Sequence, residues 1–340
     1  MTKHTAANWN VLDDDYTQTF FHQNVMQFWT DEEIPISDDL ISWAELSQTE
    51  RTVYAKVLGG LTLLDTKQTN VGMPVISIIV NGHQRKAVLN FMGAMEGIHA
   101  KSYSSIYTTL LVGQEDIQDV FDWVEDNPHL QYKAEAISAR YNKALHNHVL
   151  DIPDNKARYM ALVASVLLES YLFYSGFYYP LYLAGLQKMV SSGEIIGLIL
   201  RDESIHGLYV GMLAQALFAE LSEQEQEEAR AEVKALLADL HENEVAYTKS
   251  LYDPIGITDD VIKFIEYNAN KAMANLALDP VFDTTAKDIN PIVLNGIDTS
   301  AANHDFFSKK GSSYVVAMNV EKITSEHFDI EIIDEFGDKI

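Results

Sequence analysis

Two short motifs in this chain each place a histidine three residues after a glutamate. They are Glu96-Gly-Ile-His99 and Glu203-Ser-Ile-His206, and both lie in predominantly apolar stretches. Residues three apart share one face of an α-helix, so each motif can present an oxygen and a nitrogen ligand to the same point. A carboxylate in an apolar helix carries a heavy desolvation cost unless it has a partner, which indicates that these acids bind something.

Two further acids follow apolar runs, Asp65 after Leu-Thr-Leu-Leu and Glu169 after Val-Leu-Leu. One motif alone would favour a buried ion pair with an ordinary core histidine, but two motifs with two such acids favour a shared metal site. Four helices that each offer an inward carboxylate, two of them with a histidine, are typical of a dinuclear site in a ferritin-like bundle. Four carboxylates balance two divalent cations, and this donor set suits iron or manganese. The predicted ligands are Asp65, Glu96, His99, Glu169, Glu203 and His206.

Long helices are needed to hold these ligands in place, and the sequence predicts them. Apolar residues recur at steps of three and four from Val88 to Leu110, which indicates a helix of six turns around the first motif. The capping-box pattern Ser47-Gln-Thr-Glu50 predicts the start of another helix, which carries Asp65. That helix is expected to end near Thr66, where a loop with Gly72 and Pro74 follows.

Most of the remaining chain also has helical periodicity. A buried helix is expected from Asp154 through Glu169, with distortions at Gly176 and Pro180. The other predicted segments are turns near 113–116 and 126–128, and helices over about 131–148, 192–218, from the capping box at 222–225, and 259–278. Period-two alternation is scarce, so the predicted fold is all-α, a ferritin-like helical bundle with long helices and an extended C-terminal tail. We expect residues 1–287 to form the helical domain and 288–340 an irregular segment ending in a partner-docking tail.

Composition excludes several classes of function. Fifty acidic and 24 basic residues give a net charge of −26, which repels phosphate backbones and anionic lipid, so we expect no nucleic-acid partner and no membrane. The chain has no cysteine, which excludes disulfides and thiol nucleophiles and is compatible with a cytoplasmic location. Residues 161–186 are long and apolar enough to span a bilayer. However, they contain Glu169 and scattered tyrosines, as a buried core helix does.

At the residues of the metal pattern the chain resembles the small, radical-generating subunit of class I ribonucleotide reductase. It is most similar to the class Ib branch, which uses manganese or iron. The resemblance covers nearly the whole chain and is carried by segments at 27–29, 61–65, 83–90, 95–104, 168–177, 200–206, 303–308 and 311–314.

The resemblance implies a role for each matching residue. It makes the six predicted ligands the holders of two manganese or two iron ions per chain. It also makes Tyr103, one turn beyond His99, the site of a stable tyrosyl radical, and positions 99 and 103 do share a helix face. The implied apolar pocket of the radical consists of Phe173, Phe177 and Ile199. The implied radical-transfer residues are Trp29, Asp202 and Tyr314.

The absence of cysteine then indicates that nucleotide reduction takes place on another subunit. In this family the reduction of a ribose 2′-hydroxyl needs a cysteine thiyl radical and a reducing dithiol, and this chain contains neither. The resemblance therefore implies a large catalytic subunit that binds the C-terminal tail and reduces ribonucleoside diphosphates with the oxidising equivalent delivered to it. It also implies a homodimer of this chain and a flavodoxin-like activator protein.

Two other functions fit parts of the pattern. A metal-storage protein of ferritin type would have about half this length, without the placement of Tyr103 or the long tail. Another ferritin-like di-metal oxidase would need a substrate cavity beside the metals. The acidic, apolar-studded segment 321–340 is either a solvated terminus or the docking tail.

Overall fold

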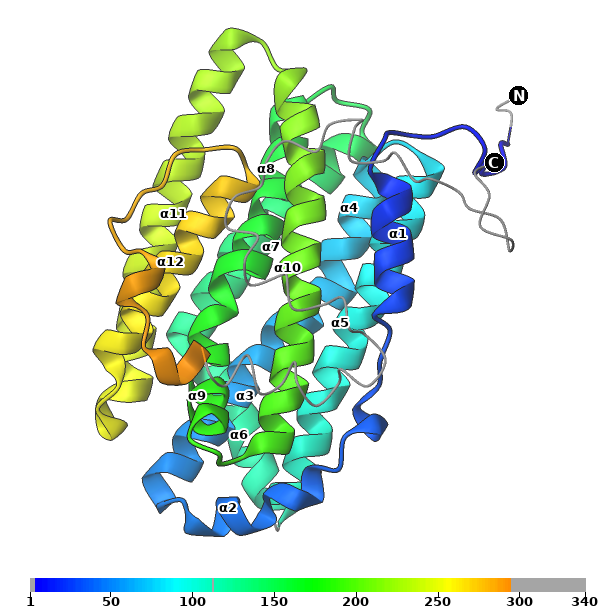
Figure 1. Ribbon diagram of the computed structural model, residues 1–340. Coiled ribbons are helices and arrows are strands. Elements are labelled where there is room, and N and C mark those ends of the chain that lie inside the picture. Colours follow the sequence, from blue (N-terminus) through cyan, green and yellow to red (C-terminus); the bar gives the residue numbers. More distant parts are fainter. Residues whose placement is uncertain (1–3, 112, 295–340) are drawn as a thin grey trace, which may run out of the picture. The chain divides into compact units, whose positions relative to one another are not determined.

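The computed structural model describes residues 4–111 and 113–294, and these residues form helices joined by short loops (Figure 1). No strand occurs in the described part of the chain, so the predicted all-α class is confirmed. The longer α-helices are α1 (Thr17–Met26), α3 (Gln48–Lys67), α5 (His83–Leu110), α6 (Gln114–Asp126), α7 (Pro128–Val149), α8 (Asn155–Leu167), α9 (Tyr174–Gly185), α10 (Val190–Ala219), α11 (Glu223–Tyr252) and α12 (Thr258–Asn275). The short elements are α2 (Leu40–Glu45), α4 (Met73–Ile79), the π-turns η3 (Gln68–Gly72) and η4 (Leu168–Leu172), and the 3₁₀ turns η1 (Asp31–Glu33), η2 (Ile36–Asp39), η5 (Asp253–Ile255) and η6 (Ala286–Asp288).

Four helical segments form the bundle that holds the site. α3 packs against α5, α5 against α10, α10 against α8 and α9, and α9 against α3, which closes the ring. Both predicted capping boxes are present: Ser47 and Glu50 begin α3, and Ser222 and Glu225 begin α11. Because the cap residues satisfy backbone N–H groups that have no partner within the helix, each fixes where its long helix starts.

The predicted loop after Thr66 is wrong, because the helix continues from α3 through η3 into α4. In η3 the backbone N–H of Met73 bonds to the carbonyl of Gln68, five residues back. This wider turn absorbs one extra residue, and Pro74, which has no N–H to donate, can follow it without breaking the helix. A proline near a glycine therefore marks a π-turn here, and not the end of a helix.

The second long buried helix is distorted at a different place from the one predicted. Its π-turn η4 includes Glu169, and the N–H of Phe173 reaches the carbonyl of Leu168 at 3.4 Å. Gly176 lies inside α9, where a Cβ atom would come within 2.6 Å of a Leu61 methyl group, so the glycine allows α3 and α9 to approach closely. The sequence also missed α6, which begins inside the predicted turn at 113–116 and buries only Val120 and Val124.

The helix Asn155–Gly185 (α8, η4 and α9) is long and apolar enough to cross a membrane, but its most apolar window is entirely buried inside the protein. It is therefore a core helix of the bundle, as the sequence predicted. Of the predicted C-terminal segment 288–340, only residues up to 294 lie in the described part of the chain.

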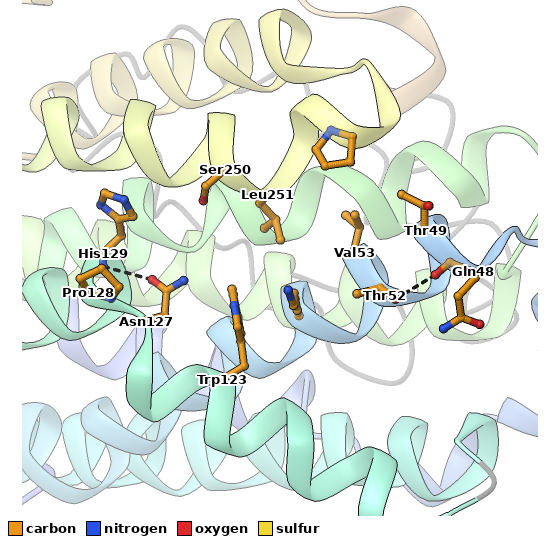
Figure 2. Close-up of a pocket in the computed structure, with 12 residues that line it drawn as sticks. Gln48, Thr49, Thr52, Val53, Trp123, Asn127, Pro128, His129, Ser250 and Leu251 are labelled. Atoms are coloured by element: carbon orange, nitrogen blue, oxygen red, sulfur yellow. Dashed lines mark hydrogen bonds between the residues drawn. The ribbon is translucent and has the colours of Figure 1, made fainter.

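A cavity of about 470 Å³ opens between the starts of α3 and α7 and the end of α11 (Figure 2). Lys56 lies on its wall with the ammonium 4.9 Å from the centre of the Trp123 ring. At the start of α7 the backbone N–H of His129 donates to the side-chain oxygen of Asn127.

Candidate metal centre

All six predicted ligand side chains meet inside the bundle. Each is completely buried, and they come from four segments, namely Asp65 from α3, Glu96 and His99 from α5, Glu169 from η4, and Glu203 and His206 from α10. Their donor atoms form two groups in which all atoms lie within 4.8 Å of one another. The first group is Asp65, Glu96, His99 and Glu203, and the second is Glu96, Glu169, Glu203 and His206. Two neighbouring positions therefore share the carboxylates of Glu96 and Glu203.

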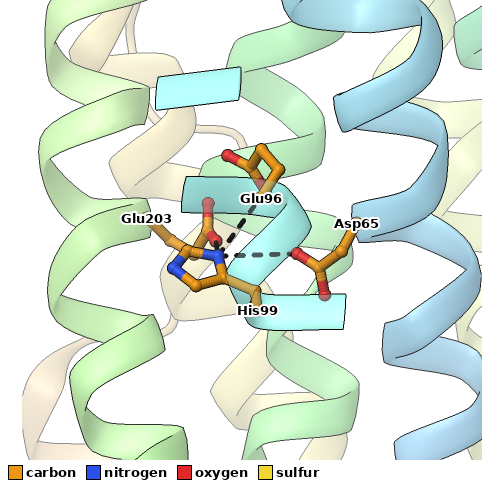
Figure 3. A group of neighbouring side chains, drawn as sticks. All are labelled: Asp65, Glu96, His99 and Glu203. Atoms are coloured by element: carbon orange, nitrogen blue, oxygen red, sulfur yellow. Dashed lines mark ion pairs between the residues drawn. The ribbon is translucent and has the colours of Figure 1, made fainter. Parts of the chain in front are cut away.

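Both histidines turn the same ring atom toward the shared carboxylates. Nδ1 of His99 lies 2.9 Å from Oε1 of Glu203 and 3.7 Å from Oδ1 of Asp65. Figure 3 shows these carboxylates around the His99 imidazole. Nδ1 of His206 lies 2.7 Å from Oε1 of Glu96. Each histidine thus approaches the glutamate of the other motif more closely than that of its own, where the distances are 3.6 and 3.5 Å.

The hydrogen bonding of these atoms tests whether metal ions fit here. Both oxygens of Asp65, Glu96 and Glu203, Oε2 of Glu169, and Nδ1 of both histidines are buried without a geometrically acceptable hydrogen bond. Buried polar atoms normally have hydrogen-bond partners, and so many without one in a single cluster, with only ion-pair contacts to one another, would strongly destabilise the fold. Two ions bound by these oxygens and nitrogens would satisfy them, so the donor set fits a dinuclear centre.

The electrostatics of the ligands lead to the same conclusion. Desolvation raises the pKa of Asp65 and that of Glu169 well above their ordinary values. Desolvation also acts on Glu203, but its contacts with Glu169, His206 and His99 outweigh this effect and lower its pKa. For His99 and His206 desolvation lowers the pKa, yet the surrounding carboxylates outweigh it and raise the pKa well above the usual range. Without metal the site therefore holds protons, which cations would have to displace.

A buried polar chain connects this cluster to Trp29. The indole Nε1 of Trp29 donates to Oδ2 of Asp202 at 2.7 Å, and Nε2 of His99 lies 3.2 Å from the same oxygen. The Trp29 and His99 rings are also nearly parallel, with centres 5.9 Å apart and planes inclined by 18°. The structure thus brings two of the three predicted transfer residues to the ligand His99, Asp202 by a polar contact and Trp29 by stacking and through Asp202. The third, Tyr314, lies outside the described residues.

Tyr103 is fully buried one turn after His99, and its hydroxyl has no acceptable hydrogen-bond partner. Burial and then the nearby charge of Asp65 raise the pKa of Tyr103 well above its ordinary value. The predicted pocket residues Phe173, Phe177 and Ile199 are all fully buried in the same core, with the two phenylalanine rings 5.7 Å apart.

Sequence reasoning missed Gln68 and Tyr141. Gln68 is fully buried and its side-chain amide donates to Oε1 of Glu169 and, at 2.9 Å, to Oγ of Ser165. The Tyr141 hydroxyl donates to Oε1 of Gln68 at 2.9 Å. A signal existed, because Gln68 lies three residues after Asp65 and therefore on the same face of the helix.

The 470 Å³ cavity shares none of its lining residues with the ligand cluster. It is therefore not the substrate cavity beside the metals that a di-metal hydroxylase would need.

Comparison with known proteins gives a consistent result. The sequence model of the family described as "Ribonucleotide reductase, small chain" matches residues 6–291. The chain is 53% identical to the ribonucleoside-diphosphate reductase subunit beta of Bacillus subtilis over 333 residues, which cover 97% of this chain and 98% of the relative. It is 38% identical to the Escherichia coli ribonucleoside-diphosphate reductase 2 subunit beta, with 94% and 97% covered. Among solved structures, dimanganese(II)-NrdF of Streptococcus sanguinis matches with a TM-score of 0.81 and 45% identity, covering 87% of this chain and all of the other.

Proposed function

The chain belongs to the ribonucleotide reductase small-chain family, and on that premise we propose that its six buried ligands hold a dinuclear manganese or iron centre that serves a tyrosyl radical on Tyr103. As the beta subunit of a ribonucleoside-diphosphate reductase, it delivers an oxidising equivalent to a large catalytic subunit. The observation that carries the proposal is the set of buried ligand atoms without hydrogen bonds, arranged as two groups that share Glu96 and Glu203.

Two ions held by the six ligands would, once an external oxidant had raised them above the divalent state, supply the oxidising power that removes an electron from Tyr103. The protein contributes the surroundings. Asp65 is the carboxylate whose charge acts most strongly on the Tyr103 phenol, so an acceptor for the phenolic proton is at hand. Tyr103 is fully buried, in the same core as the equally buried Phe173, Phe177 and Ile199, and we assign these three residues the exclusion of water and reductants that a long radical lifetime requires.

Transfer out of the site follows the polar chain from His99 through Asp202 to Trp29. Because Nε1 of Trp29 and Nε2 of His99 meet the same oxygen of Asp202, a proton can shift along the chain as an electron passes between the rings. We assign Tyr314 the last step on this subunit, from which the oxidising equivalent passes to the catalytic subunit.

The partners are proposed from the family and from composition. The chain has no cysteine, so the thiol chemistry of nucleotide reduction belongs to the large subunit, which the C-terminal tail binds. We further propose a homodimer, a flavodoxin-like activator that provides the oxidant for a manganese centre, and a cytoplasmic location.

Metal stoichiometry tests the central claim. The metal-free chain, titrated with Mn(II) or with Fe(II) in the absence of oxygen, should bind two ions per chain. When excess Fe(II) and oxygen are then supplied, the iron content should stay at two per chain, whereas an iron-storage protein would accumulate many more. Replacing a shared ligand in Glu203→Ala should reduce the content well below two while the fold survives, because alanine favours helix and a buried acid is removed. Glu194→Ala on the same helix, outside the cluster, is the control and should keep two ions. Full occupancy in Glu203→Ala would contradict the assignment of Glu203.

A further inference from the structure

Asp65 and Glu169 each belong to only one of the two ligand groups, and the protein holds them differently. Both oxygens of Asp65 lack a hydrogen-bond partner. Glu169 accepts a hydrogen bond from the amide of Gln68 at Oε1, so that Oε2 alone is free. Oε2 is also the oxygen that faces His206, 3.8 Å from its Nδ1. The contact with Gln68 therefore determines which oxygen of Glu169 points into the cluster.

The orientation of the Gln68 amide is itself fixed. An amide has a donor end and an acceptor end, and only the donor end can bind a carboxylate. The hydroxyl of Tyr141 donates to Oε1 of Gln68 at 2.9 Å, and Nε2 donates to Ser165 as well as to Glu169. A flipped amide would lose these bonds and turn an oxygen toward the carboxylate.

The backbone of the π-turn η3 leaves room for this amide. A Cβ atom on Gly72 would lie 2.8 Å from Cδ of Gln68 and 3.1 Å from Cε2 of Tyr141. The Gly72 backbone has φ −60°, which any residue can adopt, so its conformation does not require glycine. Glycine is required at this position because the Gln68 side chain occupies the space that a Cβ atom would need.

We propose that Gln68, oriented by Tyr141 and accommodated by Gly72, is a positioning residue that fixes Glu169 and sets the affinity of one metal position selectively. That position is the one formed by Glu96, Glu169, Glu203 and His206. The Gln68 side chain bonds to Ser165, Glu169 and Tyr141 and not to Asp65 or His99, so we expect the position that contains those two ligands to keep its affinity. The inference rests on the proposed function, because it takes the six side chains as metal ligands.

The test is a stepwise Mn(II) titration of the metal-free full-length chain, followed by electron paramagnetic resonance. Outer-shell partners of a ligand typically contribute roughly 10–100-fold to metal affinity. Gln68→Met keeps the length of the side chain and removes the donor, so we expect one Mn(II) to bind as in the wild type and the other to bind roughly 10–100-fold more weakly. At a concentration that fills both wild-type positions, the variant should show the six-line spectrum of isolated Mn(II) in place of a spin-coupled pair.

Two variants leave the Gln68 side chain unchanged and test its placement. Gly72→Ala should displace the amide and weaken the same metal position. Tyr141→Phe should weaken it less, because the donor to Glu169 remains and only its orientation is released. The control is Gln84→Met, which removes another buried glutamine whose amide holds the carbonyls of Asn8 and Val11 and should not alter Mn(II) binding.

The outcomes separate this inference from the proposed function. A wild-type chain that binds fewer than two Mn(II) contradicts the proposed function. A wild-type chain that binds two, with unchanged affinities in Gln68→Met and Gly72→Ala, overturns only the role of Gln68. Equal weakening at both positions would indicate a merely structural role and would also overturn it. If Gln68→Met does not fold, Tyr141→Phe decides by the same criterion.

Discussion

Tyr103 and Tyr107 lie one turn apart on α5, both buried, yet their hydroxyls differ. The Tyr107 hydroxyl donates to the carbonyl of Ala55 at 2.8 Å, whereas the Tyr103 hydroxyl has no acceptable partner and lies near the charge of Asp65. A phenol without a backbone partner, beside a carboxylate, can lose its proton locally when it is oxidised. The difference makes Tyr107 a matched control for Tyr103.

Tyr103→Phe should abolish the tyrosyl radical while leaving two metal ions bound, because only the phenolic oxygen is removed and the packing is kept. Turnover in the assay reconstituted with the large subunit should fall to background. Tyr107→Phe should keep the radical and lose about 1 kcal/mol of stability with its hydrogen bond. Electron paramagnetic resonance and deoxynucleotide formation measure the two properties. Continued nucleotide reduction by Tyr103→Phe would place the oxidant elsewhere.

Metal affinity should increase with pH. The pKa values of His99 and His206 are raised well above the usual range of histidine by the surrounding carboxylates, so metal ions must displace protons from both. Burial also raises the pKa values of Asp65 and Glu169, which acts in the same direction. Each displaced proton contributes about a tenfold change in affinity per pH unit while the group is protonated. Free Mn(II), measured by its resonance signal at pH 6.5 and pH 8, should be lower at the higher pH. Equal binding at the two pH values would show that the unloaded ligands are already deprotonated.

At the scale of single residues, the sequence predicted the charged ligands of the site and missed the neutral residues Gln68 and Tyr141 beside them. Buried acids and histidines stand out in apolar helices because an unpaired charge is costly there. Gln68 carries no charge, so its place on the helix face of Asp65 was a much weaker signal, and its importance depends on the orientation of an amide that only the three-dimensional contacts reveal.

At the scale of elements, both π-turns lie at the site, one holding Gln68 and the other Glu169. The sequence placed most helices correctly, because periodicity and capping boxes are local signals. It did not predict the π-turns, since a π-turn inserts a residue into a helix without a residue preference of its own. The widened turn is maintained by the side-chain contacts around it, and such turns frequently occur at functional sites.

The close approach of α3 and α9 at Gly176 leads to a test of packing. In Gly176→Ala the new methyl group would lie 2.6 Å from Cδ2 of Leu61. Overpacking costs typically 1–3 kcal/mol, and the better helix propensity of alanine returns about 1 kcal/mol. We therefore expect a net loss of up to about 2 kcal/mol in the free energy of unfolding, measured by denaturant titration.

The double variant Gly176→Ala with Leu61→Ala provides the control for that experiment. Removing the Leu61 methyl groups leaves space for the new Cβ, so the double variant should be more stable than the sum of the two single losses predicts. Simple additivity would mean that the two side chains do not compete for the same space.

At the scale of the whole molecule, two variants of the C-terminal segment test the proposed docking and the proposed radical transfer separately. Deleting residues 321–340 should abolish the complex with the large subunit and all turnover, with metal and radical unchanged. Tyr314→Phe should still form the complex and lose turnover, because the docking segment remains and the transferable hydroxyl is gone. Binding to immobilised large subunit and deoxynucleotide formation distinguish the two. Normal binding by the truncated chain would make 321–340 a solvated terminus, and an active Tyr314→Phe would remove that residue from the pathway.

The complete burial of all six ligands also affects how fast metal ions can enter and leave the site. None of the six ligands is exposed to solvent, so an ion from solution cannot bind to any of them at the surface. We therefore expect metal entry and departure to require local opening of the bundle. Local opening of helical cores is rare because it gives up much of the global stability. Exchange of one metal for another is then limited by the opening rate and not by relative affinity. We therefore expect a bound ion to be replaced slowly, so that the order in which Mn(II) and Fe(II) are supplied affects which metal the chain holds before equilibrium is reached.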